Sequence, residues 1–197
     1  MAEVLVLYYS LHGATESLAR EIATGIDSVK GASARLRTVP RVSSQAEAVI
    51  DDIPDAGPPD ATAEDFASCA GIVMGSPGRF GNMAAAMKYF IDGTLNEWLK
   101  GSAAGKPAAV FTSTGSLHGG QETTLLSLAL PLLHHGMVFV GVPYSEPALS
   151  RTTTGGTHYG ATHVSWSRDN DALSADEIEI ARALGARVAS TAIKLNA

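Results

Sequence analysis

Short, continuous apolar runs alternate along this chain with amphipathic stretches of helical period, and this alternation constrains the fold more than any other feature. Runs that are apolar on both faces are typical of strands in a parallel sheet covered by helices. The runs predicted as strands are residues 4–9, 34–39, 71–75, 107–113 and 137–142. The stretches predicted as helices are residues 15–26, 83–99, 122–135 and 174–193. The pattern predicts an α/β fold: a doubly wound, five-stranded parallel sheet in the order 2-1-3-4-5, with helices on both faces.

Two segments stand outside the alternation, and we expect both to lie on the surface of a single domain, residues 1–197. The length of 197 residues fits one domain with a sizeable core. A surface excursion is expected at about 42–63, and a Gly-rich insertion at about 143–170. Pro131 should kink or interrupt its helix, whereas Ser174 with Glu177 forms a capping-box pattern at the start of the last one.

The charge and the cysteine content indicate which binding partners and which cellular compartment to expect. The formal net charge is -6 and no basic run stands out, which argues against nucleic acid as a partner. The single Cys69 excludes an internal disulfide and is expected to be a small buried residue. We find no signal-peptide pattern and no apolar run long enough to span a bilayer, so we expect a cytoplasmic protein. The histidines lack metal-ligand spacing, so no metal site is expected.

The loops after the first, third and fourth predicted strands are the unusual parts of the sequence, and the predicted topology brings them to one place. In a doubly wound sheet, ligands bind beyond the carboxyl ends of the strands, near the point where the strand order reverses. The first loop places two hydroxyls and a glycine at a helix N-terminus, which suits a phosphate, although Ser10 or Thr15 could simply cap the helix. Its residues are Ser10, Leu11, His12, Gly13, Ala14 and Thr15.

The other two loops are also rich in glycine and unusual for β–α connections. The loop at residues 76–82 could grip a planar heterocycle through Gly78, Arg79 and Phe80, or it could be a plain turn with an exposed arginine. The loop after the fourth strand is longer than most such connections, and alone it also fits a flexible surface turn. Its residues are Ser113, Thr114, Gly115, Ser116, Leu117, His118 and Gly119. Three such loops at one sheet edge favour a binding site over three unrelated turns.

Several motifs together identify a family resemblance that runs over nearly the whole chain. The matching stretches are residues 4–10 (VLVLYYS), 79–83 (RFGNM), 113–115 with 119–122 (STG and GGQE), 134–138 (HHGMV), and 155–157 with 159–162 (GGT and YGAT). In this order and spacing they resemble the WrbA family of flavodoxin-like NAD(P)H:quinone oxidoreductases. The resemblance implies a flavodoxin-like fold with flavin mononucleotide (FMN) as cofactor. It also implies a ping-pong reaction in which NAD(P)H delivers two electrons that reduce a quinone to a hydroquinone.

The resemblance further implies which residues contact the cofactor. The FMN phosphate would occupy the loop of residues 10–15. Gly78, Arg79 and Phe80 would line the isoalloxazine and ribityl region, and residues 113–119 would wrap the polar edge of the ring.

Three other residues take roles from the resemblance. His134 would be the family histidine near the flavin, bonding to the charged edge of the reduced ring as a catalytic group. Trp98 would help to form the substrate face above the flavin near a subunit interface, and His12 would face the nicotinamide. The family assembles as tetramers, which the segment at residues 152–164 would help to build.

Four departures from the family pattern bear on the site. His12 stands where relatives carry tyrosine, Gly78 replaces a hydroxyl residue, residues 117–118 lengthen the third loop, and Pro131 precedes His134. Two other functions stay open: a flavodoxin-type electron carrier without small-molecule turnover, and a binding or regulatory protein that keeps the fold. The modest charge and the Gly-rich insertion argue against the first, and the retention of all three loops argues against the second.

Overall fold

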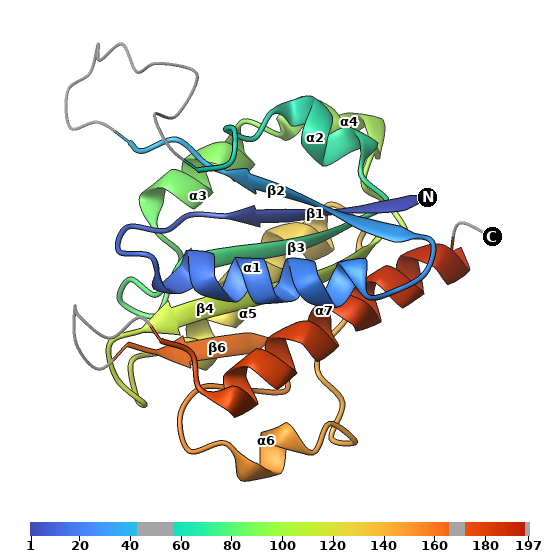
Figure 1. Ribbon diagram of the computed structural model, residues 1–197. Helices are drawn as coiled ribbons and strands as arrows, with labels where there is room; N and C mark the ends of the chain where they lie inside the picture. Colours follow the sequence, from blue (N-terminus) through green and yellow to red (C-terminus); the bar gives the residue numbers. More distant parts are fainter. Residues whose placement is uncertain (43–56, 166–171, 196–197) are drawn as a thin grey trace.

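A parallel sheet forms the centre of the molecule, and its strands run in the order β2-β1-β3-β4-β5. The computed structural model describes residues 1–42, 57–165 and 172–195 (Figure 1). The strands are β1 (Ala2–Tyr8), β2 (Ala32–Thr38), β3 (Gly71–Pro77), β4 (Pro107–Thr114), β5 (Val138–Phe139) and β6 (Ala161–Val164). Every pairing between them is parallel. The predicted fold class and strand order are confirmed.

The fifth position in the sheet is filled by two short strands in series, where the sequence predicted one. β5 pairs with the first residues of β4, Pro107 and Ala108, whereas β6 pairs with its last residues, 111–114. The chain leaves the sheet after β5 and returns at β6. Its return needs Gly160, because a Cβ at this position would overlap the carbonyl oxygen of Val110 in β4. The sheet therefore has six strands among the described residues, and the predicted strand at 137–142 is limited to Val138–Phe139.

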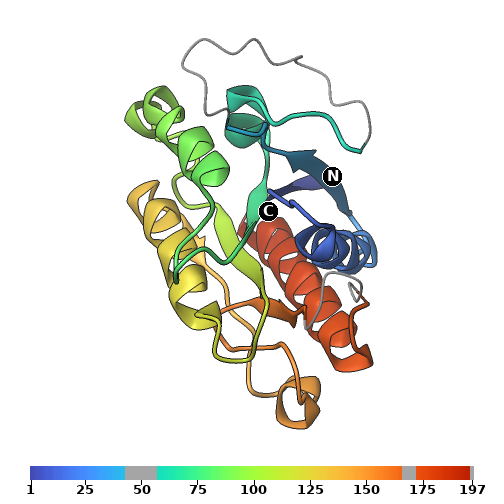
Figure 2. The same cartoon turned by 90° about the vertical axis from the view of Figure 1, so that its left-hand side faces the viewer.

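Helices cover both faces of the sheet and create two apolar cores. On one face lie α1 (Ala14–Asp27) and α7 (Ala175–Leu195), and on the other lie α2 (Ala63–Ser68), α3 (Ala85–Asp92) and α5 (Gln121–His134). Figure 2 shows these layers edge on, with α1 and α7 on one side of the strands and α3 and α5 on the other. The helices α4 (Leu95–Lys100) and α6 (Ala148–Arg151) are short. α1 and α7 touch closely at Gly25 and Gly185, where a Cβ would overlap a carbonyl oxygen of the opposite helix.

Two helix predictions need correction. The stretch predicted as one helix at 83–99 is two, because α3 ends at Asp92 with Gly93 as its C-cap, and the Thr94 hydroxyl donates to the Ile91 carbonyl at 2.7 Å. α5 runs without interruption through Pro131, because the proline lies in the last turn and its carbonyl still accepts from the His135 N–H at 3.0 Å. Only the bond that the missing N–H would have made is lost.

Other predictions on helices and loops have mixed outcomes. The capping box of α7 is confirmed: the Ser174 hydroxyl accepts from the Glu177 N–H at 3.2 Å, and Glu177 accepts from the Ser174 N–H at 2.7 Å. Most of the excursion expected at 42–63 and the end of the insertion expected at 143–170 lie outside the described residues. The described part of the insertion contains α6 and β6. Across the described residues, we find no helix with the length and apolar character that a membrane span requires.

Candidate functional site

The carboxyl edge of the sheet brings together the three loops that the sequence singled out. The Thr15 hydroxyl in the first loop and the Ser113 hydroxyl in the third lie 2.8 Å apart and are buried. The Gly78 N–H in the second loop donates to the Ser113 carbonyl at 2.9 Å. A Cβ on Gly120 would lie 3.1 Å from the Cα of Gly81, so the second and third loops also touch. All three loops extend from the left edge of the sheet in Figure 1.

The helices that follow the first and third loops begin without a side-chain cap. The N-cap residues are Gly13, with φ at 95°, and Gly120, with φ at 83°. Among the described residues, no side chain caps either helix. Ser10 instead accepts from the Gly13 N–H at 3.1 Å, and Thr15 turns inward to Ser113. The first N–H groups of these helices are therefore free to bind an anion, which the helix dipole also favours. The alternative that Ser10 or Thr15 caps α1 is wrong.

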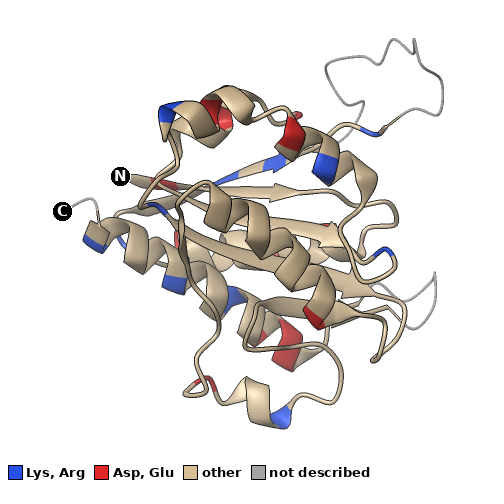
Figure 3. Cartoon of the chain, turned by 180° about the vertical axis from the view of Figure 1, so that it is seen from behind, with Lys and Arg blue, Asp and Glu red and all other residues tan. Residues whose placement is uncertain are grey.

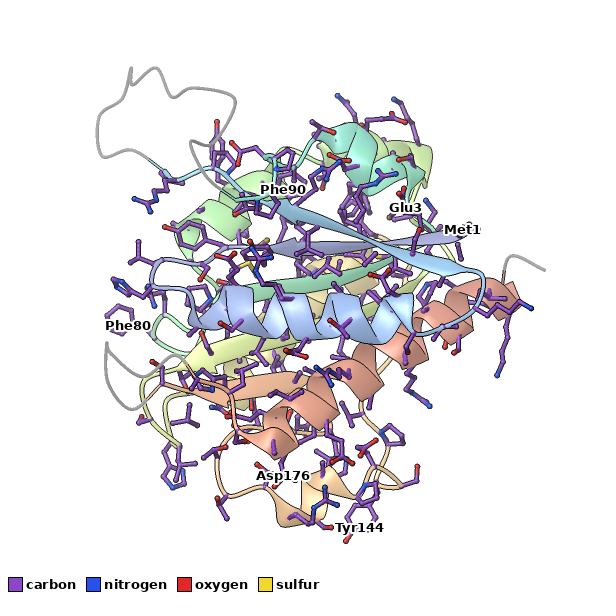
Figure 4. All side chains as sticks on the ribbon, in the orientation of Figure 1. Met1, Glu3, Phe80, Phe90, Tyr144 and Asp176 are labelled. Atoms are coloured by element: carbon purple, nitrogen blue, oxygen red, sulfur yellow. The ribbon has the colours of Figure 1, made fainter. Side chains whose placement is uncertain are left out.

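The second loop is a tight turn that holds an aromatic side chain in water. The backbones of Arg79 and Asn82 exchange two hydrogen bonds of 2.8 and 2.9 Å. Phe80 between them has φ at 53°, the one positive value for a residue other than glycine in the described ranges. It is fully exposed, and Figure 4 shows its ring projecting away from the molecule at the edge where the loops lie. An exposed aromatic in a strained conformation indicates a binding role.

The third loop is anchored at its base and exposed at its tip. The Thr114 hydroxyl donates to the Ser116 carbonyl at 2.9 Å and accepts from the Gln121 amide at 2.9 Å. Residues 115–118 are exposed, and Leu117 stands at the rim as Leu11 does in the first loop. The site thus combines buried hydroxyls and free N–H groups with an exposed apolar rim, an arrangement that suits a ligand with one anionic and one flat apolar part.

Arg79 carries the only formal charge within the loops of residues 10–15, 76–82 and 113–119. Its guanidinium is exposed and donates to the neighbouring Gly78 carbonyl at 2.9 Å. Figure 3 shows the remaining blue and red segments mainly on the helices and on β2. Within these loops, Arg79 is therefore the single formal charge beside the dipoles of the helix N-termini.

Sequence reasoning missed a buried polar cluster behind the third loop. His163 in β6 and Glu177 in α7 lie 3.0 Å apart and are almost completely buried. Burial alone would raise the pKa of Glu177, but hydrogen bonds from His163 and from the backbone N–H groups of Ser174 and Gly155 lower it to about 2. The capping-box pattern pointed to Glu177, whereas no signal in the sequence pointed to His163.

Two predicted site residues lie at the opposite edge of the sheet. The Trp98 indole donates to the His134 carbonyl at 2.7 Å, joining α4 to the end of α5. His134 ends a helix of 14 residues that begins at the third loop, which places it about 20 Å from the site. Next to it, His135 bonds to the Thr94 hydroxyl at 3.0 Å, and burial lowers its pKa. Within one chain, Trp98 and His134 do not reach the three loops.

The fold defines a flavodoxin-like α/β protein, and its candidate binding site lies at the carboxyl ends of β1, β3 and β4. Residues 2–146 match the family model of NADPH-dependent FMN reductase. The chain belongs to this family. Across the described residues, no group of three His, Cys, Asp or Glu side chains is arranged to hold a metal ion.

Comparison with curated proteins and solved structures agrees with this membership. An NAD(P)H dehydrogenase (quinone) of Trichlorobacter lovleyi is 41% identical over 209 aligned positions, covering 100% of both chains. Another, of Solidesulfovibrio magneticus, is 39% identical and covers 98% of this chain and 99% of its own. The flavodoxin and WrbA-like protein of Agrobacterium tumefaciens superposes with a TM-score of 0.71 at 23% identity, over 98% of this chain and 99% of that one. The expected resemblance to flavodoxin-like NAD(P)H:quinone oxidoreductases is confirmed.

Proposed function

We propose that the protein is an FMN-dependent NAD(P)H:quinone oxidoreductase that reduces quinones to hydroquinones by two electrons. The observation that carries the proposal is the joining of the three loops around an uncapped helix N-terminus, through the Thr15–Ser113 and Gly78–Ser113 hydrogen bonds. The names of the full-length relatives, NAD(P)H dehydrogenase (quinone), support the reaction.

The residues of the site fit FMN. The N–H groups at the start of α1, beginning with Ala14, would bind the phosphate without any lysine or arginine in the loop. Phe80, Leu11 and Leu117 are exposed apolar side chains around this polar centre and would contact the flat ring. We assign the cofactor to residues 10–15, 78–80 and 113–119.

FMN, when bound, accepts a hydride from NAD(P)H and delivers two electrons to a quinone. Backbone N–H groups of residues 115–118 would hold the ring, as donors toward negative charge at its polar edge, whereas the Gly119 N–H already donates to the Ser116 carbonyl at 3.1 Å. His12 is exposed in the first loop, where it would meet the nicotinamide. NAD(P)H and the quinone would use the same open face in turn, which predicts ping-pong kinetics.

We further propose that the enzyme is a homotetramer in which Trp98 and His134 of the partner subunit complete the site. This assignment reconciles their roles with their position at the far edge of the sheet. An apolar surface surrounds them, and no residue of α5 between Glu122 and His134 is charged, as the long tan helix in Figure 3 shows. The exposed apolar side chains of α3, α4 and α5 are Tyr89, Leu95, Trp98, Leu99, Leu126, Leu130 and Leu133.

Anaerobic stopped-flow absorbance of the FMN-loaded protein tests the reaction. We expect bleaching of the flavin by NADH or NADPH and recovery on addition of benzoquinone. Tight FMN binding without bleaching by either nucleotide would contradict the oxidoreductase and favour an electron carrier.

A matched pair of aromatic variants tests the shared site. Trp98→Ala should lower kcat/KM for benzoquinone about tenfold, the loss of one stacking contact, and leave FMN bound. Tyr144→Ala removes a more exposed aromatic from the insertion and should have no effect. Light scattering should give four subunits for the parent; a fully active monomer would refute the shared site.

A further inference from the structure

The short helix α4 lies at the surface, and none of its six residues is buried. Two hydrogen bonds join it to the end of α5. The Trp98 indole donates to the His134 carbonyl at 2.7 Å, and the hydroxyl of Thr94, the N-cap of α4, lies 3.0 Å from Nε2 of His135. We call these two bonds the α4 clamp. Because α4 buries no apolar side chain, the position of Trp98 depends on this clamp.

The His135 half of the α4 clamp is buried, whereas the Trp98 half is exposed. Thr94 is 2% exposed and His135 8%, against 45% for Trp98. The His135 imidazole also meets the Phe66 ring of α2, with the ring centroids 4.8 Å apart. Water therefore cannot replace the bond between Thr94 and His135 unless these elements move apart.

The hydroxyl of Thr94 determines which nitrogen of His135 carries the proton. It donates its one proton to the Ile91 carbonyl at 2.7 Å, so toward His135 it can only accept. Nε2 of His135 is therefore the protonated nitrogen, and Nδ1 holds a lone pair. Nδ1 is buried and has no hydrogen-bond partner in the part of the chain that the structure describes. A second proton on the ring would form a buried N–H without an acceptor, which destabilises the charged imidazole.

The groups around His135 act on its protonation in opposite directions. Burial lowers its pKa, the Glu97 carboxylate of α4 opposes this shift, and the neighbouring His134 adds to it. Lys106, which precedes β4, directs its ammonium to the Ala67 carbonyl of α2 at 2.6 Å. The resulting pKa of His135 lies below 6.5, the ordinary value, so the imidazole is neutral at neutral pH.

We propose that His135 is a positioning residue for Trp98: its neutral imidazole holds Thr94 at the start of α4, and protonation at Nδ1 opens the clamp. A charged imidazole gains hydration when it moves toward water, and this movement breaks the bond to Thr94. The exposed bond of Trp98 is then left alone to hold α4 against α5, so the indole loses its fixed orientation. The consequence for activity rests on the proposed function, in which Trp98 completes the site of another subunit.

Three variants of the full-length protein separate hydrogen bonding from titration. His135→Gln places an N–H near the position of Nε2 and cannot titrate, so the clamp should stay closed at every pH. Thr94→Val keeps the shape of the side chain but removes the acceptor, so the clamp should be open at every pH. His158→Gln is the matched control, because His158 lies in the insertion and its Nδ1 is 3.1 Å from the Val142 carbonyl.

The indole N–H resonance of Trp98 in the FMN-free protein reports the state of the clamp. The chain has two tryptophans, and the resonance that is missing from Trp98→Phe belongs to Trp98. In the parent and in His158→Gln, we expect this resonance to move as the pH falls below 6.5. It should keep the parent's neutral position in His135→Gln and the parent's acid position in Thr94→Val. An unmoved resonance in the parent, or the same movement in His135→Gln, would overturn the proposal.

Quinone kinetics of the FMN-loaded protein test the consequence for the reaction. The ratio of kcat/KM for benzoquinone between His135→Gln and the parent should rise from about one to about ten as the pH falls, the loss expected for Trp98→Ala. The Kd for FMN should stay equal in the two proteins. Thr94→Val combined with Trp98→Ala should be no slower than Trp98→Ala, because both act through the indole. Additive losses would overturn the positioning role.

The two measurements fail independently. If the resonance moves as expected but Trp98→Ala reduces quinone as fast as the parent, the shared site of the proposed function is refuted and the clamp stands. If Trp98→Ala is slow but the resonance of the parent does not respond to pH, the proposed function stands and the role of His135 is refuted.

Discussion

Replacing Glu177 by glutamine should destabilise the protein at neutral pH and flatten the dependence of its stability on acid. The carboxylate accepts four hydrogen bonds and is buried, and its pKa is lowered from 4.5 to about 2. Each pKa unit corresponds to about 1.4 kcal/mol, so the ionised form contributes roughly 3 kcal/mol to the free energy of unfolding. The glutamine amide nitrogen cannot accept, so two of the four donors lose their acceptor, which gives a loss of similar size, about 3 kcal/mol.

The pH window follows from the direction of the pKa shift. A carboxyl group whose pKa is lower in the folded state contributes its full stability above its ordinary value of 4.5, and loses it as the pH falls toward 2. Urea unfolding of parent and Glu177→Gln should therefore differ by about 3 kcal/mol at pH 7 and converge near pH 2. Glu179→Gln is the control, since this neighbour is half-exposed and pairs at the surface with Arg151, where water weakens the ion pair. Parallel pH curves for parent and Glu177→Gln would refute the reasoning.

Three further substitutions test the site and its support. Gly13→Ala places a Cβ at a φ of 95°, so it should weaken FMN binding and lower the free energy of unfolding by about 1 kcal/mol. Gly105→Ala is the control: it has a φ of 78° in open space, so it should lower only the free energy of unfolding. Phe80→Gly relieves a positive φ and removes an exposed ring, so urea unfolding should show a gain of about 0.5–1 kcal/mol while titration shows weaker FMN binding. Gly185→Ala should lower the free energy of unfolding by roughly 3 kcal/mol, because its Cβ would force α7 away from the Ile22 carbonyl in α1. A loss of stability no larger than that of Gly105→Ala would contradict this close packing.

The sheet could be predicted because its strands carry their signal locally. The predicted runs at 4–9, 71–75 and 107–113 each fall on a strand of the structure, because these segments are apolar on both faces. The split of the fifth position could not be predicted in the same way. β6 has four residues, and it joins the sheet through a close approach of Gly160 to β4, a contact that depends on residues distant in the sequence.

The loops of the site could be predicted, but not the groups that hold them. Gly13, the hydroxyls of Thr15 and Ser113, and the turn at Phe80 all follow strands whose order was predictable, so their meeting at one edge was predictable too. The His163–Glu177 pair lies on two elements brought together only by the insertion, and a single histidine in a polar segment carries no periodic signal.

Helix capping distinguishes the candidate site at β1, β3 and β4 from the part of the same edge that lies at β6. α7 also begins at the carboxyl edge, but Ser174 and Glu177 close its N-terminus with a complete capping box. α1 and α5 begin at Gly13 and Gly120, whose positive φ values turn the chain into the helix without supplying a side-chain acceptor. The N–H groups left free lie where the strand order reverses, which is where an anionic ligand gains the most from two helix N-termini at once. The choice between a glycine and a serine at the start of each helix therefore sets which helix N-termini keep free N–H groups at this edge.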